Sequence, residues 1–137
     1  MQRPAVSLPL TRPGAAIRAV RRALDRHPIE AVEVRDAMPA LERGDTKALV
    51  AMQDVIAALV EREDEAYLRL ADQGRSVSAM EAFCRARVAS ALLVLLKHDS
   101  PEATVEAIYE AHASLDPIDA EQLLAELKNA LGPTGGR

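Results

Sequence analysis

The sequence predicts an all-α fold, a single-domain helical bundle of five to six helices. Apolar residues recur at spacings of three and four through most of the chain, which is the period of helices that bury one face. Capping residues, prolines and isolated glycines separate these periodic stretches. With 137 residues, 49% of them hydrophobic and 28% charged, the chain can bury one core but not two. Six glycines, eight prolines and one cysteine exclude collagen-like and disulfide-stapled folds, and the apolar fraction excludes disorder for most of the chain.

The N-terminal part begins with residues 1–13, which we expect to form an irregular, proline-containing lead. Its three prolines remove backbone donors and bias the residues before them away from the helical conformation. An α-helical domain is expected to follow over residues 14–131. Residues 14–27 predict a short amphipathic helix. Its narrow apolar face consists of Ile17, Val20 and Leu24.

Residues 29–38 fit two interpretations. Val32 and Val34 alternate as in a strand. Ile29 and Val32, however, are three residues apart, a spacing that fits one or two helical turns. We favour a helix, because the sequence contains no second strand pattern to pair with a first one. A short turn that starts at Pro39 is expected to end at Gly44.

The longest predicted helix begins at Asp45, a favourable N-cap residue, and continues to about Asp72 before Gly74 ends it. Its apolar residues are Leu49, Met52, Ile56, Leu59, Val60, Tyr67 and Leu70. This stripe is longer than the helix expected to pack against it, so Tyr67 and Leu70 overhang. Either another chain packs on the overhang, or the first helix or the lead covers it.

The next predicted helix is the central one. It opens with a capping box of Ser78 and Glu81 and runs to about Lys97. Its second half is apolar nearly all round, so we expect that half to be buried by other helices.

The last two predicted helices have the same start signal. Ser100-Pro101 and Asp116-Pro117 each combine an N-cap residue with a proline at the first helical position. Residues 132–137 are expected to be a disordered tail.

The net charge of −4 is distributed unevenly. Residues 1–27 carry six arginines and one aspartate, which gives +5, whereas the other residues carry 11 basic and 20 acidic side chains, which gives −9. The arginines of the helix over residues 14–27 are Arg18, Arg21, Arg22 and Arg26. A basic helix of this kind either binds an anionic partner or packs on the acidic remainder of the chain.

Nucleic-acid and membrane binding are both disfavoured. Few aromatic platforms exist for base stacking, because Tyr67, Phe83 and Tyr109 sit at core-like positions. The helices joined at residues 114–116 present acidic side chains where a helix-turn-helix needs basic ones. The longest strongly apolar run, residues 88–96, is far shorter than the ~20 residues needed to cross a bilayer.

No constellation of catalytic or metal-binding residues stands out. Cys84 lies beside Phe83 on a helix expected to enter the core, where a thiol behaves as a small hydrophobic group. The acids that follow Ser100 line one helix face, but the histidine of that helix lacks the Glu-x-x-His spacing of di-iron bundles. The glycines are isolated and form no phosphate loop. We therefore expect no enzyme activity, no metal and no cofactor.

These observations lead us to expect a non-enzymatic interaction or assembly module that binds a protein partner or a second copy of itself through helix faces. The predicted contact residues are Arg18, Arg21, Arg22, Arg26, Tyr67 and Leu70. One alternative is a nucleic-acid-associated protein that uses the arginine-rich helix, and another is a small helical ligand-binding protein or enzyme. The single cysteine and the proline-broken N-terminal stretch favour a cytoplasmic location without a membrane anchor.

Overall fold

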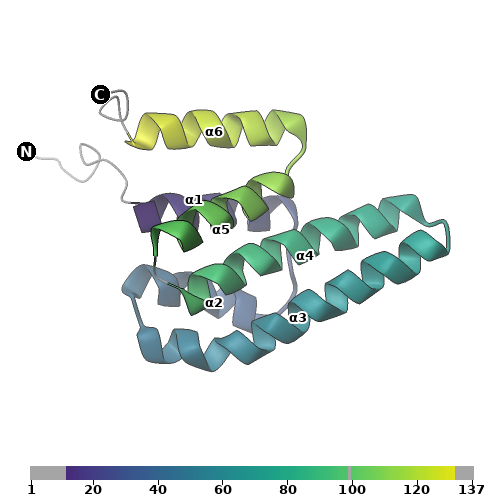
Figure 1. Cartoon of the computed structure of the whole chain (residues 1–137), viewed down its shortest axis with the longest axis horizontal. Helices are drawn as coiled ribbons and strands as arrows, with labels where there is room; N and C mark the ends of the chain where they lie inside the picture. Colours follow the sequence, from purple (N-terminus) through teal and green to yellow (C-terminus); the bar gives the residue numbers. More distant parts are fainter. Residues whose placement is uncertain (1–11, 99, 132–137) are drawn as a thin grey trace, which may run out of the picture.

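The computed structural model describes residues 12–98 and 100–131, and these residues form a bundle of α-helices without any strand (Figure 1). In chain order the helices are α1 (Arg12–Arg26), α2 (Val32–Arg43), α3 (Thr46–Asp72), α4 (Ser76–Lys97), α5 (Pro101–Ala113) and α6 (Pro117–Leu131). The predicted all-α bundle is confirmed, and the ambiguous segment 29–38 is helical from Val32 onward. The predicted lead up to residue 11 and the predicted tail after residue 131 lie outside the described residues.

The helices pack around α4. α3 runs antiparallel to α4, and the two make the most extensive helix–helix contact of the described chain (Figure 1). α1 and α5 pack against α4, α2 packs against α3, and α6 lies on α1 and α5. The largest fully buried side chains are Val20, Ile56, Val88, Leu92 and Leu123.

Alanine supplies most of the core. Of the 25 buried hydrophobic residues in the described chain, 15 are alanines. Such small side chains let helix backbones approach closely, so the bundle is compact although the chain has only three aromatic residues. On α4, Ala86, Ala89 and Ala91 are all buried.

The α3–α4 hairpin extends beyond the other helices (Figure 1). We call residues 60–87 the projecting hairpin and the other described residues the bundle. α3 has no buried residue after Leu59. On α4, the buried residues before Val88 are Ala79, Ala82 and Ala86. The projecting hairpin is therefore held mainly by the contact between its own two helices.

Three predicted helix starts and two predicted stops are confirmed. Asp45, Ser100 and Asp116 each accept a hydrogen bond from the backbone N–H three residues later, at 3.2, 3.1 and 2.8 Å. Gly44 and Gly74 follow α2 and α3 with φ of 67° and 76°, the left-handed conformation that strains any residue with a side chain.

The predicted start of α4 is wrong by three residues, from an N-cap at Ser78 to one at Arg75, because the turn before it is tight. The N–H of Arg75 donates to the Leu70 carbonyl, and the Arg75 carbonyl already accepts the N–H of Ala79, both at 2.9 Å. The helix is thus established before Ser78, which lies inside it. The predicted capping box of Ser78 and Glu81 does not form the helix start.

The two N-terminal helices also differ from the prediction. α1 begins at Arg12, inside the predicted lead, because Pro13 fits a first helical turn, where no backbone donor is needed. α2 continues through Pro39 to Arg43, so the expected turn at that proline is wrong. The missing N–H of Pro39 removes a single helical hydrogen bond, which the rest of the helix tolerates.

One aromatic residue expected at a core position lies on the surface. Tyr109 is 69% exposed, and Val105, one turn earlier on α5, is 67% exposed. The core-facing side of α5 is formed by small residues instead. They include Ala103, Ala107 and Ala111.

Candidate functional site

The arginines of α1 form a row that faces α6. Arg18, Arg22 and Arg26 are spaced four residues apart and so share one helix face. Arg18 lies 3.6 Å and Arg22 3.3 Å from carboxylate oxygens of Glu126. Nε of Arg26 lies 2.5 Å from a carboxylate oxygen of Asp119. Later arginines of α1 thus meet earlier acids of α6, so the two helices are antiparallel. The acidic face of α6 covers the arginine row.

Further polar contacts complete this arrangement. Arg22 also donates to the Gln122 side chain at 2.7 Å, and Arg26 lies 3.5 Å from Asp116. Arg21 points elsewhere and pairs with Glu42 of α2. Each of the four arginines predicted as partner contacts thus meets an acid of its own chain. Of the two interpretations left open by the sequence, packing on the acidic remainder of the chain is the one present in the structure.

The predicted apolar overhang of α3 does not stand free. The Tyr67 ring packs against the Phe83 ring of α4, with centroids 5.4 Å apart, and Leu70 one turn later is half-buried. α4 begins early enough to run alongside the end of α3 (Figure 1). α4 therefore covers part of the overhang, and whether another chain or the lead also contacts it stays a prediction.

Two ion pairs fix the position of the projecting hairpin. Nε of Arg85 lies 3.1 Å from Glu63, which joins α4 to α3. Arg87 donates to Glu110 of α5 at 2.8 Å and lies 5.0 Å from the centroid of the Phe83 ring. The hydrogen bond to Glu110 raises the pKa of Arg87 above its ordinary value, with burial opposing the shift. The Arg87–Glu110 contact anchors the base of the hairpin to α5, whereas the Arg85–Glu63 pair joins the two helices of the hairpin to each other.

An apolar face of α4 remains uncovered, and the sequence did not single it out. Val77, Met80, Cys84, Val88 and Ala91 follow a spacing of three and four, so they form one stripe along the helix. Val88 and Ala91 are fully buried in the bundle, whereas Val77 is 77% and Met80 56% exposed. We call Val77, Met80 and Cys84 the open stripe. It is the continuation of the core-facing side of α4 past the end of the bundle.

A shallow, almost entirely apolar pocket of about 360 Å³ lies along the open stripe. His27, just after α1, closes one side of it, and Nε2 of His27 donates to the Ser114 carbonyl at 2.7 Å. Burial raises the pKa of the Cys84 thiol, and nearby Arg85 partly opposes this shift. A raised pKa favours the neutral thiol, so Cys84 adds apolar surface to the open stripe.

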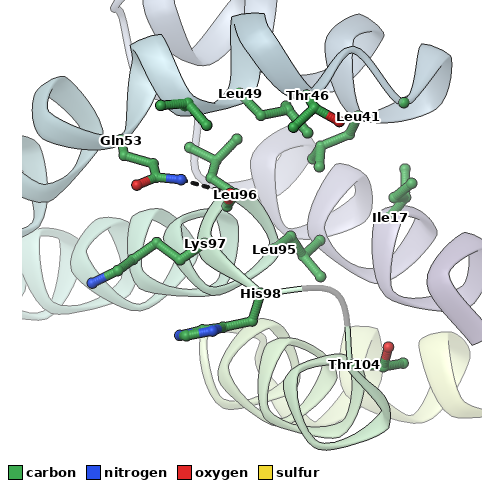
Figure 2. Close-up of a pocket in the computed structure, with 12 residues that line it drawn as sticks. Ile17, Leu41, Thr46, Leu49, Gln53, Leu95, Leu96, Lys97, His98 and Thr104 are labelled. Atoms are coloured by element: carbon green, nitrogen blue, oxygen red, sulfur yellow. Dashed lines mark hydrogen bonds between the residues drawn. The ribbon is translucent and has the colours of Figure 1, made fainter.

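A second cavity, of about 450 Å³, lies at the opposite end of α4 (Figure 2). The end of α2, the start of α3 and the end of α4 surround it. Single residues of α1 and α5 complete its wall. Its aliphatic lining consists of Ile17, Leu41, Leu49, Val50, Leu95 and Leu96. Gln53 closes one side by donating from Nε2 to the Leu96 carbonyl at 3.0 Å.

Comparison with known proteins assigns no family: no protein-family model, no curated protein and no solved structure matches this chain. Within residues 12–98 and 100–131, no helix is both long and apolar enough to cross a bilayer. In the same residues, no three histidine, cysteine, aspartate or glutamate side chains come together as a potential metal-ligand group.

Proposed function

We propose that this protein is a self-associating helical interaction module, and that the open stripe of α4 packs on the same stripe of a second copy. The observation that supports the proposal is the continuity of the stripe. The same face of α4 that the bundle buries at Val88 runs on, exposed, through Met80 to Val77. An exposed continuation of a core face is the kind of surface that a partner covers.

A second copy fits this surface because the surface is self-complementary. A two-fold interface uses the same patch on both copies. The patch must therefore contain both a protruding side chain and a hollow that receives it. Val77 is 77% exposed and lines the shallow pocket together with Met80 and Cys84. Antiparallel packing of two α4 helices brings Val77 of one copy against Met80 of the other.

Charges near the open stripe fit the same arrangement, because Glu81 lines the pocket beside the stripe and Arg75 immediately precedes α4. Arg75 and Glu81 are both exposed, and within the described residues neither side chain has an ion pair or hydrogen bond. In the antiparallel pair, Arg75 of each copy comes within reach of Glu81 of the other. Two identical ion pairs then border the apolar contact and fix its register.

The interface proposed here is short. The open stripe covers about two helical turns, less than the roughly 800 Å² per partner of a standard interface. We therefore expect a reversible dimer that forms at tens of micromolar. We also infer a reducing compartment such as the cytoplasm, because the single cysteine has no second cysteine in its own chain.

Sedimentation velocity across a concentration series tests the proposal. The unmodified chain is expected to shift from monomer to dimer, and Met80→Glu is expected to remain monomeric because it places carboxylates at the apolar contact. Val105→Glu, on the exposed face of α5, is the matched control and is expected to dimerise normally. A chain that stays monomeric at several hundred micromolar, or a Met80→Glu variant that still dimerises, contradicts the proposal.

A charge exchange tests the register. Glu81→Arg alone places two arginines at each end of the apolar contact and is expected to weaken the dimer. Combining it with Arg75→Glu restores opposite charges and is expected to restore dimerisation. If the double variant is as weak as the single one, the antiparallel register is wrong.

A further inference from the structure

The outer side of α5 is uncovered although it carries an aromatic residue. Val105 and Tyr109 are four residues apart, so they lie together on this side, and both are exposed. The inner side of α5 packs on α1 and α4 mainly through Ala103, Ala107 and Ala111. Because these small side chains already fill the contact, the larger valine and tyrosine cannot turn inward without pushing the helices apart.

Two carboxylates border this apolar pair. Glu102 and Glu106 are both exposed, and within residues 12–98 and 100–131 neither side chain has an ion pair or a hydrogen bond. Glu106 lies three residues before Tyr109 and four after Glu102, so the three side chains are neighbours on the helix surface. Arg87 of the adjoining α4 is already paired with Glu110. The surface that we call the α5 face consists of Glu102, Val105, Glu106 and Tyr109.

The charges of the α5 face discriminate between possible occupants. Its two carboxylates repel the phosphates of nucleic acids and of anionic membranes. A second copy packed on this face about a two-fold axis would bring the two Glu106 side chains to the same side of the contact, close to the axis, where like charges oppose each other. A partner that carries basic residues beside an apolar seam meets neither penalty and pairs with both carboxylates.

We propose that the α5 face binds a basic amphipathic helix of another protein. Val105 and Tyr109 pack on the apolar side of that helix, and Glu102 and Glu106 pair with arginine or lysine on its flank. Tyrosine suits the centre of such a contact, because it buries a large ring while its hydroxyl stays in water. The carboxylates at the rim favour encounter with a basic partner and fix the register of the contact. The α5 face shares no residue with the open stripe, so this inference is independent of the proposed self-association.

Fluorescence anisotropy with two synthetic peptides tests the proposal. One is a labelled helical peptide with leucines along one side and arginines on both flanks, and the other has glutamates in place of the arginines. We expect the basic peptide to bind the full chain at one saturable site, and the acidic peptide to bind at least about tenfold more weakly. The Met80→Glu variant alters only the open stripe and is expected to bind the basic peptide as tightly as the unmodified chain.

Two sets of substitutions on the α5 face separate its apolar and its charged parts. Tyr109→Ala is expected to weaken binding of the basic peptide about tenfold, because it removes the largest apolar contact. Glu102→Gln combined with Glu106→Gln is expected to weaken binding about fivefold at low salt and to have less effect at high salt, because screening already weakens the ion pairs there.

The outer side of α3 supplies matched controls, because it also combines an exposed leucine with exposed acids. Leu68 is exposed, and within the described residues Glu61 and Glu65 have no ion pair or hydrogen bond. Leu68→Ala, and Glu61→Gln combined with Glu65→Gln, are expected to leave the affinity for the basic peptide within about twofold of its original value.

Circular dichroism melting curves establish that each variant is folded before its binding is compared. The proposal is overturned if the basic peptide shows no saturable binding, or if the acidic peptide binds equally well. Equal losses for the α3 and α5 substitutions would show a general attraction to negative charge and would also overturn it. Nuclear Overhauser contacts of the Tyr109 ring with residues 1–11 or with a second copy, in the absence of peptide, would identify another occupant and have the same consequence.

Discussion

The two halves of α4 differ in sequence and in their surroundings. In the bundle, α4 is apolar nearly all round and meets α1, α3 and α5, and its large side chains Val88 and Leu92 are fully buried. In the projecting hairpin, α4 carries charged residues and meets α3 through alanines and the Phe83–Tyr67 contact, while Val77 and Met80 stand exposed. The apolar stripe that runs through both halves is buried only where several helices surround it.

This difference separates residues that stabilise the fold from residues that are available to a partner. A large side chain in the bundle loses all contact with water, and its removal leaves a cavity. A large side chain on the open stripe loses little on truncation, because it has few contacts to lose. The predictions below use this contrast, and the first has the largest expected effect.

Truncation of one residue in each half of α4 gives the strongest contrast. Leu92→Ala is expected to lower the free energy of unfolding by about 2–5 kcal/mol, because Leu92 is fully buried among several helices. Met80→Ala is expected to change it by no more than about 0.5 kcal/mol at concentrations where the chain is monomeric. Urea denaturation measures both values. Similar losses for the two variants would show that the open stripe is part of the core.

The second prediction compares the residues at the starts of α3 and α4. Asp45→Ala is expected to cost about 1 kcal/mol, because it leaves the N–H of Ala48 without its capping acceptor at the start of α3. Ser78→Ala is expected to be neutral or slightly stabilising, since Ser78 lies inside α4 and alanine favours helix. A cost for Ser78→Ala equal to that for Asp45→Ala would support the capping box that the structure lacks.

The third prediction concerns salt, which acts on the ion pairs that hold α6 and not on the apolar packing of α4 inside the bundle. The arginine row holds α6 through exposed or partly exposed ion pairs, each worth about 0–1 kcal/mol. At about 1 M salt, where the Debye length falls to roughly 3 Å, we expect faster amide hydrogen exchange in α6. Exchange in residues 88–96 of α4, which carry no charged side chain, is the internal control and should remain unchanged. Equal acceleration in both regions would contradict a specific electrostatic contact between α1 and α6.

The smallest expected effect is a change of stability with pH. The backbone N–H of Asp119 donates to Asp116 and, with Arg26 nearby, holds the pKa of Asp116 below its ordinary value. A carboxyl with a lowered folded-state pKa stabilises the fold above its unfolded pKa of about 3.9, and this contribution disappears as pH falls towards the folded value. Asp116→Asn keeps a capping side chain but cannot ionise, so its stability should fall less steeply below about pH 4.

Thermal unfolding curves between neutral pH and strongly acidic pH measure that slope. Asp36→Asn, an exposed substitution on α2 away from any ion pair in the described residues, is the matched control. An Asp116→Asn variant with the same acid dependence as the unmodified chain would show that the local hydrogen bond does not favour the charged carboxylate.

Local chemistry made much of the fold predictable from the sequence. The six helices, their caps at Asp45 and Ser100, and the glycine stops depend on residues close together in the chain. The exact start of α4 was not predictable from its capping motif, because a tight turn set by backbone hydrogen bonds from Arg75 began the helix earlier.

The candidate surfaces were harder to predict, because they depend on contacts between distant segments. The basic character of α1 was visible, but its pairing with Glu126 joins residues about a hundred positions apart. The apolar stripe through Met80 was not singled out, because the part of α4 that lies beyond the other helices depends on how the helices are arranged (Figure 1). The predicted apolar contact at Tyr67 and Leu70 of α3 stays a prediction beside this stripe.

The most direct test of the proposed self-association is an isotope-filtered nuclear Overhauser experiment on a mixture of labelled and unlabelled chains, at a concentration where dimers form. We expect intermolecular contacts between the Met80 methyl group of one copy and the Val77 methyl groups of the other. Intermolecular contacts from Val105 or Tyr109 instead, or the absence of any involving Val77 and Met80, would contradict the central claim that the open stripe of α4 is the interface.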